Sequence, residues 1–187
     1  MTRRFIRMQV LTLPGIGNSG PDHWQSHWEQ LNKNHTRVNQ LNWDNPHCTE
    51  WIAALEQSVK RCGSNTILVA HSLACLLVAH WAAKTNLRIK AALLVAVPNP
   101  TSATFPIQAV GFTSLPMQRL PFKSTVIASN NDPYAGIAYA EECASAWGSN
   151  FVNIGDAGHI NSASGLGAWP EGYKHLQRLQ DLSAPNK

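Results

Sequence analysis

The chain has 187 residues, 44% of them hydrophobic, and a formal net charge of +4. This length predicts one domain over residues 1–187 with a substantial core, and the hydrophobic content excludes a disordered chain. The basic residues are scattered and form no run, so the charge pattern argues against a nucleic-acid partner.

Strand-like and helix-like segments alternate from the start of the chain. Met8 to Leu13 is predicted to form a strand that ends at Pro14-Gly15. Pro21 to Leu31 is predicted to form a helix, because Trp24 and Trp28 lie four residues apart on one helical face and proline suits a first turn.

A second strand and a second helix follow. Arg37 to Trp43 has the pattern of a weaker strand. Thr49 is a candidate cap for a helix that ends at Gly63, with Lys60 and Arg61 near the negative end of its dipole. The apolar face of this helix consists of Ile52, Leu55, Val59 and Cys62.

The most apolar segments lie in the centre of the chain. Thr66 to Ala70 and Ala91 to Val97 are continuous apolar runs, which are typical of strands covered on both faces, as in parallel sheets. Between them, Leu73 to Ala83 is apolar nearly all round and therefore predicts a buried helix.

The second half contains one irregular segment. Pro98 to Pro121 holds five of the eleven prolines, so we expect an irregular cover over the strand ends in place of a crossover helix. The remaining elements are two strands, a helix between them and a last helix: Ser124 to Ser129, Asn150 to Ile154, Tyr134 to Trp147 and a helix that begins near Pro170. The predicted fold is a three-layer α/β/α sandwich with a mostly parallel, six-stranded sheet.

Nothing in the chain indicates secretion or a membrane span. The four cysteines form no C-x-x-C pair, so metal-finger spacing is absent. The amino terminus has arginines but no apolar stretch typical of a signal peptide, and the longest apolar run, Leu73 to Ala79, is too short to cross a bilayer. We expect a cytoplasmic protein with reduced thiols and no membrane partner.

The stretch Ala70-His71-Ser72-Leu73-Ala74 places a serine at a strand-to-helix corner. This is the geometry of a nucleophile elbow, whose usual pattern is G-x-S-x-G. Strand and helix come close at such a corner, so small residues are needed two before and two after the serine. Alanine, the next smallest residue after glycine, stands at both positions. We expect the serine to hold a strained backbone conformation.

Other chemically active residues follow other predicted strands. In open α/β sheets, sites lie at the carboxyl ends of the strands. Asp132 follows the fifth strand, His159 lies a few residues after the sixth, and Pro14 to Gly17 forms a glycine-rich turn after the first. The chain order serine, aspartate, histidine is that of the α/β-hydrolase triad. We predict Ser72 as nucleophile, His159 as general base and Asp132 as the acid that orients the base.

Alternatives exist for the base and for the acid. The histidines before the serine would break the order, His71 is expected to point away from the nucleophile, and His175 lies inside the last helix. Asp156 competes with Asp132 as the acid. Because Asp156 is only three residues from His159, it would have difficulty approaching the far side of the ring, and Asp132 is preferred.

The same rim supplies candidate oxyanion donors. These are the backbone N–H groups of Leu73, just after the nucleophile, and of Ile16, in the turn after the first strand. A metal site is not expected. His23 and His27 lie four residues apart on a predicted helix, but no third ligand is evident.

Taken together, these motifs resemble the small serine hydrolases related to retinoblastoma-binding protein nine, a compact branch of the α/β-hydrolases. The matching stretches cover most of the chain: Leu13 to Ser19, Trp24 with Trp28, Trp43 to Pro46, Val69 to Ala74, Ser129 to Pro133 and Gly155 to Asn161. The resemblance implies a hydrolase with a triad of Ser72, Asp132 and His159, a sheet without the usual first two strands, and no metal or organic cofactor. Ala70 departs from the glycine that is more common in the family.

The leading hypothesis is hydrolysis of a small ester, or of a thioester or amide, through a Ser72 acyl-enzyme, with a small-molecule acyl substrate. The short chain leaves no room for a large cap domain, so Pro98 to Pro121 is the candidate lid. Candidate pocket-lining residues are Gly15, Trp43, Asp44, Phe105, Phe112 and Ile160. The alternative is a protein-interaction module with vestigial catalysis, for which the sequence names no partner.

Overall fold

A six-stranded sheet forms the centre of the computed structural model, which describes residues 8–181. Its strand order is β2-β1-β3-β4-β5-β6, and every neighbouring pair is parallel. The strands are β1 (Gln9–Leu13), β2 (His35–Arg37), β3 (Thr66–His71), β4 (Ala91–Val95), β5 (Lys123–Ala128) and β6 (Asn150–Asn153). The prediction of a mostly parallel sheet is confirmed, and the sheet is in fact wholly parallel.

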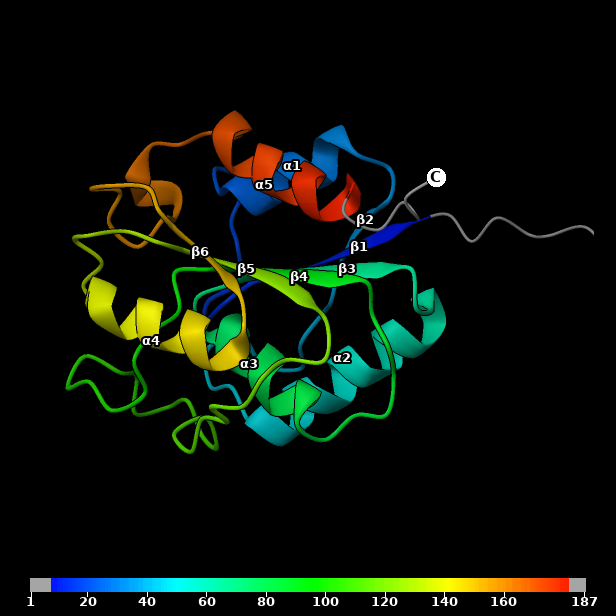
Figure 1. Ribbon diagram of the computed structural model, residues 1–187, viewed down its shortest axis with the longest axis horizontal. Helices are drawn as coiled ribbons and strands as arrows, with labels where there is room; N and C mark the ends of the chain where they lie inside the picture. The colour runs from blue at the N-terminus through cyan, green and yellow to red at the C-terminus, as the bar shows by residue number, and fades with distance from the viewer. Residues whose placement is uncertain (1–7, 182–187) are drawn as a thin grey trace, which may run out of the picture.

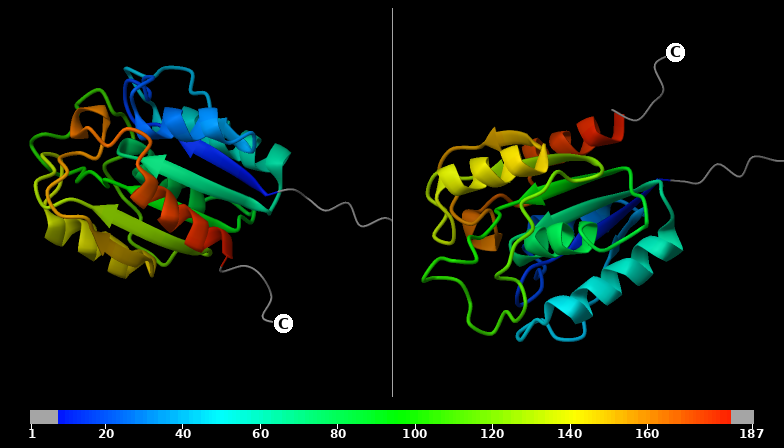
Figure 2. Two further views of the ribbon diagram at one scale, coloured as in Figure 1. Left: turned by 90° about the horizontal axis from the view of Figure 1, so that it is seen from above. Right: turned by 60° about the horizontal axis from the view of Figure 1, so that its bottom comes forward.

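Helices cover both faces of this sheet (Figure 1, Figure 2). The helices α1 (Trp24–Leu31) and α5 (Pro170–Asp181) lie on one face, and α2 (Cys48–Cys62), α3 (Leu73–Ala82) and α4 (Ile137–Trp147) lie on the other. The carboxyl ends of all strands meet at one rim, on the left of Figure 1. The predicted α/β/α sandwich is therefore confirmed. None of the helices within residues 8–181 combines the length and the apolar character needed to span a bilayer.

The two faces of the sheet have separate cores of different composition. On the α2–α4 face, residues 73–79 of α3 are all at most 2% exposed and pack among aliphatic strand residues. On the α1–α5 face, Trp24, Trp28 and Trp169 pack against one another. This second face also buries polar groups, because Gln25 donates to the carbonyls of Leu13 and Val69 at 3.1 and 3.0 Å.

The second strand differs from its prediction. It covers His35–Arg37, whereas the sequence pattern predicts Arg37 to Trp43. After Val38, whose N–H donates to Thr12 at 2.9 Å, the chain leaves the sheet, and Leu41 is 84% exposed. The edge strand is thus set by its pairing with β1 and ends where that pairing ends.

Helix starts also differ from their predictions. Helix α2 begins at Cys48, so Thr49 lies inside its first turn, and the N-cap residue His47 makes no side-chain cap bond. The Cys48 N–H instead donates to Val110 at 2.9 Å. Helix α1 begins at Trp24, three residues later than expected from Pro21. Helix α4 begins at Ile137 rather than at Tyr134.

The proline-rich segment 98–121 is irregular, as predicted, and is tied to the α2–α4 face. The Val110 N–H donates to Pro46 at 2.9 Å, and the indole N–H of Trp147 donates to Pro116 at 2.9 Å. Phe112 is fully buried against Trp51. The segment thus covers part of the core in addition to part of the rim.

Candidate active site

Ser72 occupies the sharp corner between β3 and α3. Its φ of 56° and ψ of −126° lie in a region that residues other than glycine rarely adopt. The Ser72 N–H donates to Val95 on β4 at 2.9 Å, and the Ser72 carbonyl accepts from Cys75 in α3 at 2.8 Å. Because strand and helix hold the backbone on both sides, the strained conformation is maintained. This matches the conformation expected of a nucleophile elbow.

The corner is closely packed. Ala70 and Ala74 are fully buried. A Cβ atom built at Gly15 would lie 2.9 Å from the Ser72 Cβ and 3.2 Å from the His71 carbonyl oxygen. The turn after β1 therefore passes so close to Ser72 that only glycine fits at position 15.

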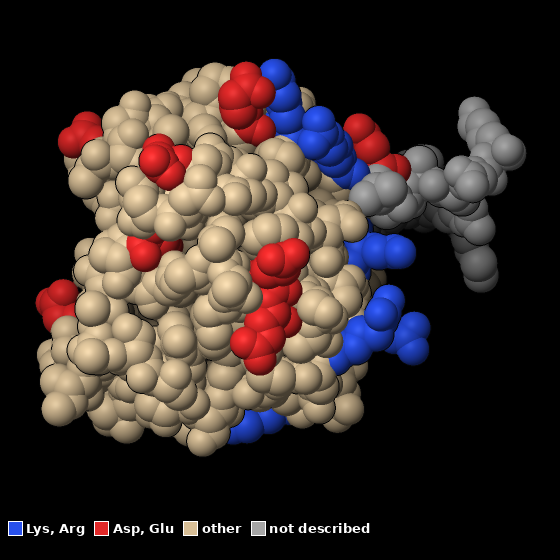
Figure 3. Space-filling view, turned by 60° about the vertical axis from the view of Figure 1, so that its left-hand side comes forward, with Lys and Arg blue, Asp and Glu red and all other residues tan. Residues whose placement is uncertain are grey.

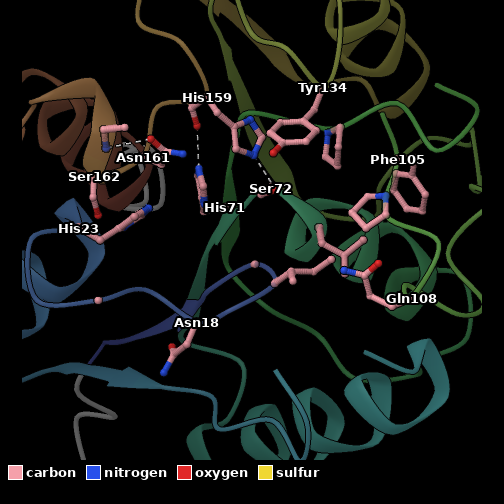
Figure 4. Close-up of a pocket in the computed structure, with 17 residues that line it drawn as sticks. Asn18, His23, His71, Ser72, Phe105, Gln108, Tyr134, His159, Asn161 and Ser162 are labelled. Carbon is pink, nitrogen blue, oxygen red and sulfur yellow. Dashed lines mark hydrogen bonds between the residues drawn. The ribbon is translucent and has the colours of Figure 1, made fainter. Parts of the chain in front are cut away.

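His159 lies between Ser72 and Asp132. Its Nε2 is 2.7 Å from the Ser72 Oγ (Figure 4), and its Nδ1 is 2.9 Å from each carboxylate oxygen of Asp132. The side chains of His159 and Asp132 are only 9% and 4% exposed. Because a carboxylate can only accept, it holds the proton on Nδ1 and leaves the Nε2 lone pair facing the Ser72 hydroxyl. The structure thus brings together the three residues whose order in the chain suggested a triad.

The loop that carries His159 is held by side chains from the end of β5. Ser129 Oγ accepts from the Ala157 N–H at 2.8 Å, and Asn131 Oδ1 accepts from the Gly158 N–H at 2.7 Å. Sequence reasoning assigned no role to Ser129 or Asn131. The loop after β5 therefore positions both the carboxylate and the backbone next to the imidazole.

Tryptophans of α1 hold the same loop from the other side. The indole N–H of Trp24 donates to the Ile160 carbonyl at 2.8 Å, and that of Trp28 donates to the Ala168 carbonyl at 2.7 Å. Ile160 is fully buried and has a φ of 49°, a strained value for a β-branched residue. The buried hydrogen bond from Trp24 and the packing of Ile160 thus maintain a backbone conformation that would otherwise be unfavourable.

Two aromatic rings flank the imidazole of His159. The ring centroids of Tyr134 and His71 lie 4.5 and 5.0 Å from that of His159. His71 had no role in the predicted site, yet its Nε2 lies 2.9 Å from the His159 carbonyl oxygen and must donate to it. Burial, and then the neighbouring His159, hold the pKa of His71 well below its usual range. His71 is therefore a neutral residue that fixes the backbone of His159.

A cavity of about 530 Å³ opens at Ser72. Ser72, Leu73, Gly15 and Ile16 contribute to it from the two strand-end turns. Phe105 and Gln108 lie on one side of Ser72, and His23, Asn161 and Ser162 lie on the other (Figure 4).

Two of the six predicted pocket residues, Gly15 and Phe105, line this cavity; the other four lie elsewhere. Phe112 and Ile160 are fully buried and belong to the two cores of the sheet. Trp43 packs edge-on against Trp51, and Asp44 lies in an exposed turn whose N–H groups bond to Asn42. These corrections have one cause: in irregular segments, sequence position does not determine which way a side chain points.

The cavity also contains residues that the sequence did not indicate. His71, Tyr134, Asn161 and Ser162 all line it. His23 lines it as well, and its Nδ1 accepts from the Gln25 N–H at 3.2 Å as the N-cap of α1. Across residues 8–181, no group of three or more His, Cys, Asp or Glu side chains is arranged to hold a metal ion.

A parallel α/β/α sandwich with a strained serine at a strand-to-helix corner is characteristic of the α/β-hydrolase fold, so the chain has this fold. Solved structures support this. A YdeN-like hydrolase from Pectobacterium atrosepticum is 29% identical with a TM-score of 0.84, covering 95% of this chain and 93% of that one. The ydeN product of Bacillus subtilis is 22% identical with a TM-score of 0.78, covering 92% and 98%.

A more distant structure shares the fold alone. Est1E from Butyrivibrio proteoclasticus, solved with ferulic acid, is 12% identical with a TM-score of 0.68, covering 93% of this chain and 90% of that one. A comparison with curated protein sequences finds no match. The family model described as serine hydrolase matches residues 10–178, and the chain belongs to this family.

Proposed function

We propose that the protein hydrolyses small carboxylic esters, with thioesters and amides as chemically related substrates, through an acyl-enzyme on Ser72. The observation that carries this proposal is the unbroken contact from Asp132 through His159 to Ser72, at 2.9 and 2.7 Å. A serine hydroxyl is a weak nucleophile at neutral pH, and a base within hydrogen-bond reach activates it.

The reaction proceeds in two halves. His159 Nε2 takes the Oγ proton as Ser72 attacks the ester carbonyl, and the resulting imidazolium gives that proton to the departing alcohol oxygen. The acyl group then remains on Ser72. A water molecule attacks this acyl-enzyme with His159 again as the base, which releases the carboxylic acid and restores the serine. Asp132 stabilises the imidazolium in both halves.

The oxyanion of each tetrahedral intermediate is assigned to the backbone N–H groups of Leu73 and Ile16. Leu73 is the first residue of α3, so its N–H has no partner within the helix and lies at the positive end of the helix dipole. In the turn after β1, the neighbouring N–H groups of Gly17 and Asn18 donate to Trp43 and Gly15. Ile16 lines the cavity beside Ser72, which makes its N–H the donor from this turn.

A fluorophosphonate probe tests the proposal. Labelling of the folded protein is expected to disappear in Ser72→Ala and to persist in Ser145→Ala, a matched change at an exposed serine on α4. A panel of esters of increasing acyl length, with thioester and amide analogues, then measures the acyl preference. Absence of labelling and of ester turnover in the folded wild-type protein would contradict the proposal and favour an interaction module.

A further inference from the structure

The cavity beside Ser72 has two unlike walls. One is largely apolar and consists of Pro98, Phe105 and Pro106, with the exposed Gln108 as its one polar member; we call it the apolar wall. The other is polar and contains His23, Asn161 and Ser162; we call these three residues the polar wall. Figure 4 shows Phe105 and the polar wall on opposite sides of Ser72. An ester that reacts at Ser72 extends to both sides of its scissile carbonyl, so its two ends meet different surroundings.

The side chain of Asn161 is held in one orientation. Its Oδ1 accepts from the Ala163 N–H at 3.0 Å, and the backbone N–H of Asn161 donates to Ser164 Oγ at 3.0 Å. These two bonds cap the short turn η1 (Ser162–Ser164). The amide group must therefore direct Nδ2 away from η1, and Figure 4 shows this nitrogen on the side of His71 and His159. Within residues 8–181, Nδ2 has no hydrogen-bond partner. It is a fixed donor on a residue that lines the same cavity as Ser72.

His23 supplies a second unused donor in the polar wall. Its Nδ1 accepts from Gln25, so in the neutral ring Nε2 carries the proton. His23 is 4% exposed, and its Nε2 finds no partner in the described part of the chain. Buried donors without a partner are uncommon in proteins and require an explanation. The buried His23 Nε2 has no partner, and the half-buried Asn161 presents a second free donor in the same wall. Together they point to an acceptor supplied by the ligand.

The charge of the surroundings indicates which kind of acceptor fits. Among residues 8–181, no Lys or Arg lines the cavity. Burial, and then Arg37, lower the pKa of His23 to about 4, so the ring is neutral near pH 7. Figure 3, which brings forward the side of the carboxyl ends of the strands, shows scattered acidic residues there, while Lys and Arg gather at the right-hand edge and at the bottom. A carboxylate in the cavity would thus lack a cation to balance it.

We propose that the polar wall binds a neutral hydrogen-bond acceptor on the substrate, such as the carbonyl oxygen of a ketone, an amide or a second ester. The hydrocarbon end of the same substrate lies against the apolar wall. This inference rests on the proposed function and narrows its substrate class to esters that carry a second, uncharged carbonyl on one side of the scissile bond.

Matched esters test this substrate class. Methyl pentanoate and methyl levulinate differ by a ketone in the acyl part, and butyl acetate and its methyl-ketone analogue differ in the same way in the alcohol part. In at least one pair, the ketone is expected to raise kcat/KM by about five- to tenfold. Monomethyl succinate, which has a carboxylate in place of the methyl ketone of methyl levulinate, is expected to react more slowly than methyl pentanoate. No ketone preference in either pair would overturn the inference.

Substitution of Asn161 tests the residue assignment. Asn161→Asp keeps the capping oxygen and removes the donor, so the ketone preference is expected to fall to about one or below. The matched control is Asn42→Asp, because Asn42 Oδ1 also caps a turn by accepting from Asp44 and Asn45, outside the cavity. In Asn42→Asp, the preference for the ketone ester is expected to persist.

Asn161→Ser serves as a second variant if Asn161→Asp does not fold, because serine can also cap the turn. A preference that persists in the folded Asn161 variant would overturn the assignment. A wild-type protein that hydrolyses neither pair and takes no fluorophosphonate label contradicts the proposed function itself, so the two failures are distinguishable.

Discussion

Ser72 and His159 are held in place by different kinds of structure. Ser72 sits between a buried strand and a buried helix, and its backbone conformation follows from close packing at the corner. His159 lies on a loop that hydrogen bonds from Ser129, Asn131 and Trp24 hold in place. The comparison teaches that the proposed nucleophile is positioned by the strand and the helix on either side of it, whereas the position of the proposed base depends on side chains from two other parts of the chain, the loop after β5 and α1.

The largest effect is expected when the carboxylate beside His159 Nδ1 loses its charge. Asp132→Asn is expected to lower kcat by about 10⁴-fold, because an amide neither fixes the same tautomer nor stabilises the imidazolium. The exposed Asp156→Asn, the competing acid on the histidine loop, is expected to change kcat by less than about threefold. Steady-state kinetics on one ester measures both. A larger loss in Asp156→Asn would reverse the choice of acid.

The next change acts on the closely packed serine corner. Gly15→Ala places a Cβ 2.9 Å from the Ser72 Cβ, so Ser72 or the turn must move. A displacement of this kind is expected to lower kcat/KM by about 100-fold. Gly136→Ala is the matched control, because a Cβ there meets no atom within 4 Å. Full activity in Gly15→Ala would show that the corner is less rigid than its packing indicates.

A third pair of variants compares the two faces of the sheet. Trp24→Phe removes the indole donor from the buried Ile160 carbonyl and is expected to lower the free energy of unfolding by about 1–3 kcal/mol. It should also lower kcat by about tenfold, because His159 precedes Ile160. Trp147→Phe removes the equivalent bond to Pro116 on the α2–α4 face, with a similar loss of stability and unchanged kcat. Denaturant melts and kinetics separate the two effects; equal kcat losses would contradict the comparison.

The smallest effect concerns the buried histidines beside α1. Burial lowers the pKa of both His23 and His35 to about 4 from 6.5. Between pH 4 and pH 6.5 the unfolded chain binds more protons than the folded chain. The free energy of unfolding therefore has its full value above pH 6.5 and declines as the pH falls toward 4. His35→Leu is expected to reduce this slope by up to about 1 kcal/mol per pH unit.

Urea melts at several pH values measure the slope. The matched control is His47→Leu at an exposed histidine, which should keep the slope of the wild type. An unchanged slope in His35→Leu would show that His35 is protonated alike in the folded and unfolded chains.

Much of the fold was predictable because it depends on local pattern. Strand-like segments bounded by turn residues located β1, β3, β4, β5 and β6 within one or two residues of their ends. The short edge strand β2 was misplaced. Its residues are largely polar, and its position depends on pairing with β1, which no local pattern records.

The site was predictable where it lies at strand ends and unpredictable where it depends on orientation. Ser72, Asp132 and His159 each follow a recognisable strand, so their meeting at one rim follows from a parallel sheet. The inward orientation of Asn161 and His23 depends on their capping bonds, which appear only in the folded chain. Apolar residues such as Phe112 seemed suited to a pocket because hydrophobicity alone does not distinguish a pocket wall from a core.

The wholly parallel sheet also has a consequence for the time course of folding. Parallel strands cannot pair through a tight hairpin, so each pairing must wait for a long stretch of chain to close. Val10 on β1 pairs with His35 on one side and with Ile67 on the other. The Ser72 corner, although local in sequence, gains its bond to Val95 only once β4 has docked. During synthesis, therefore, the proposed nucleophile gains this bond only after the chain has been made as far as Val95 on β4.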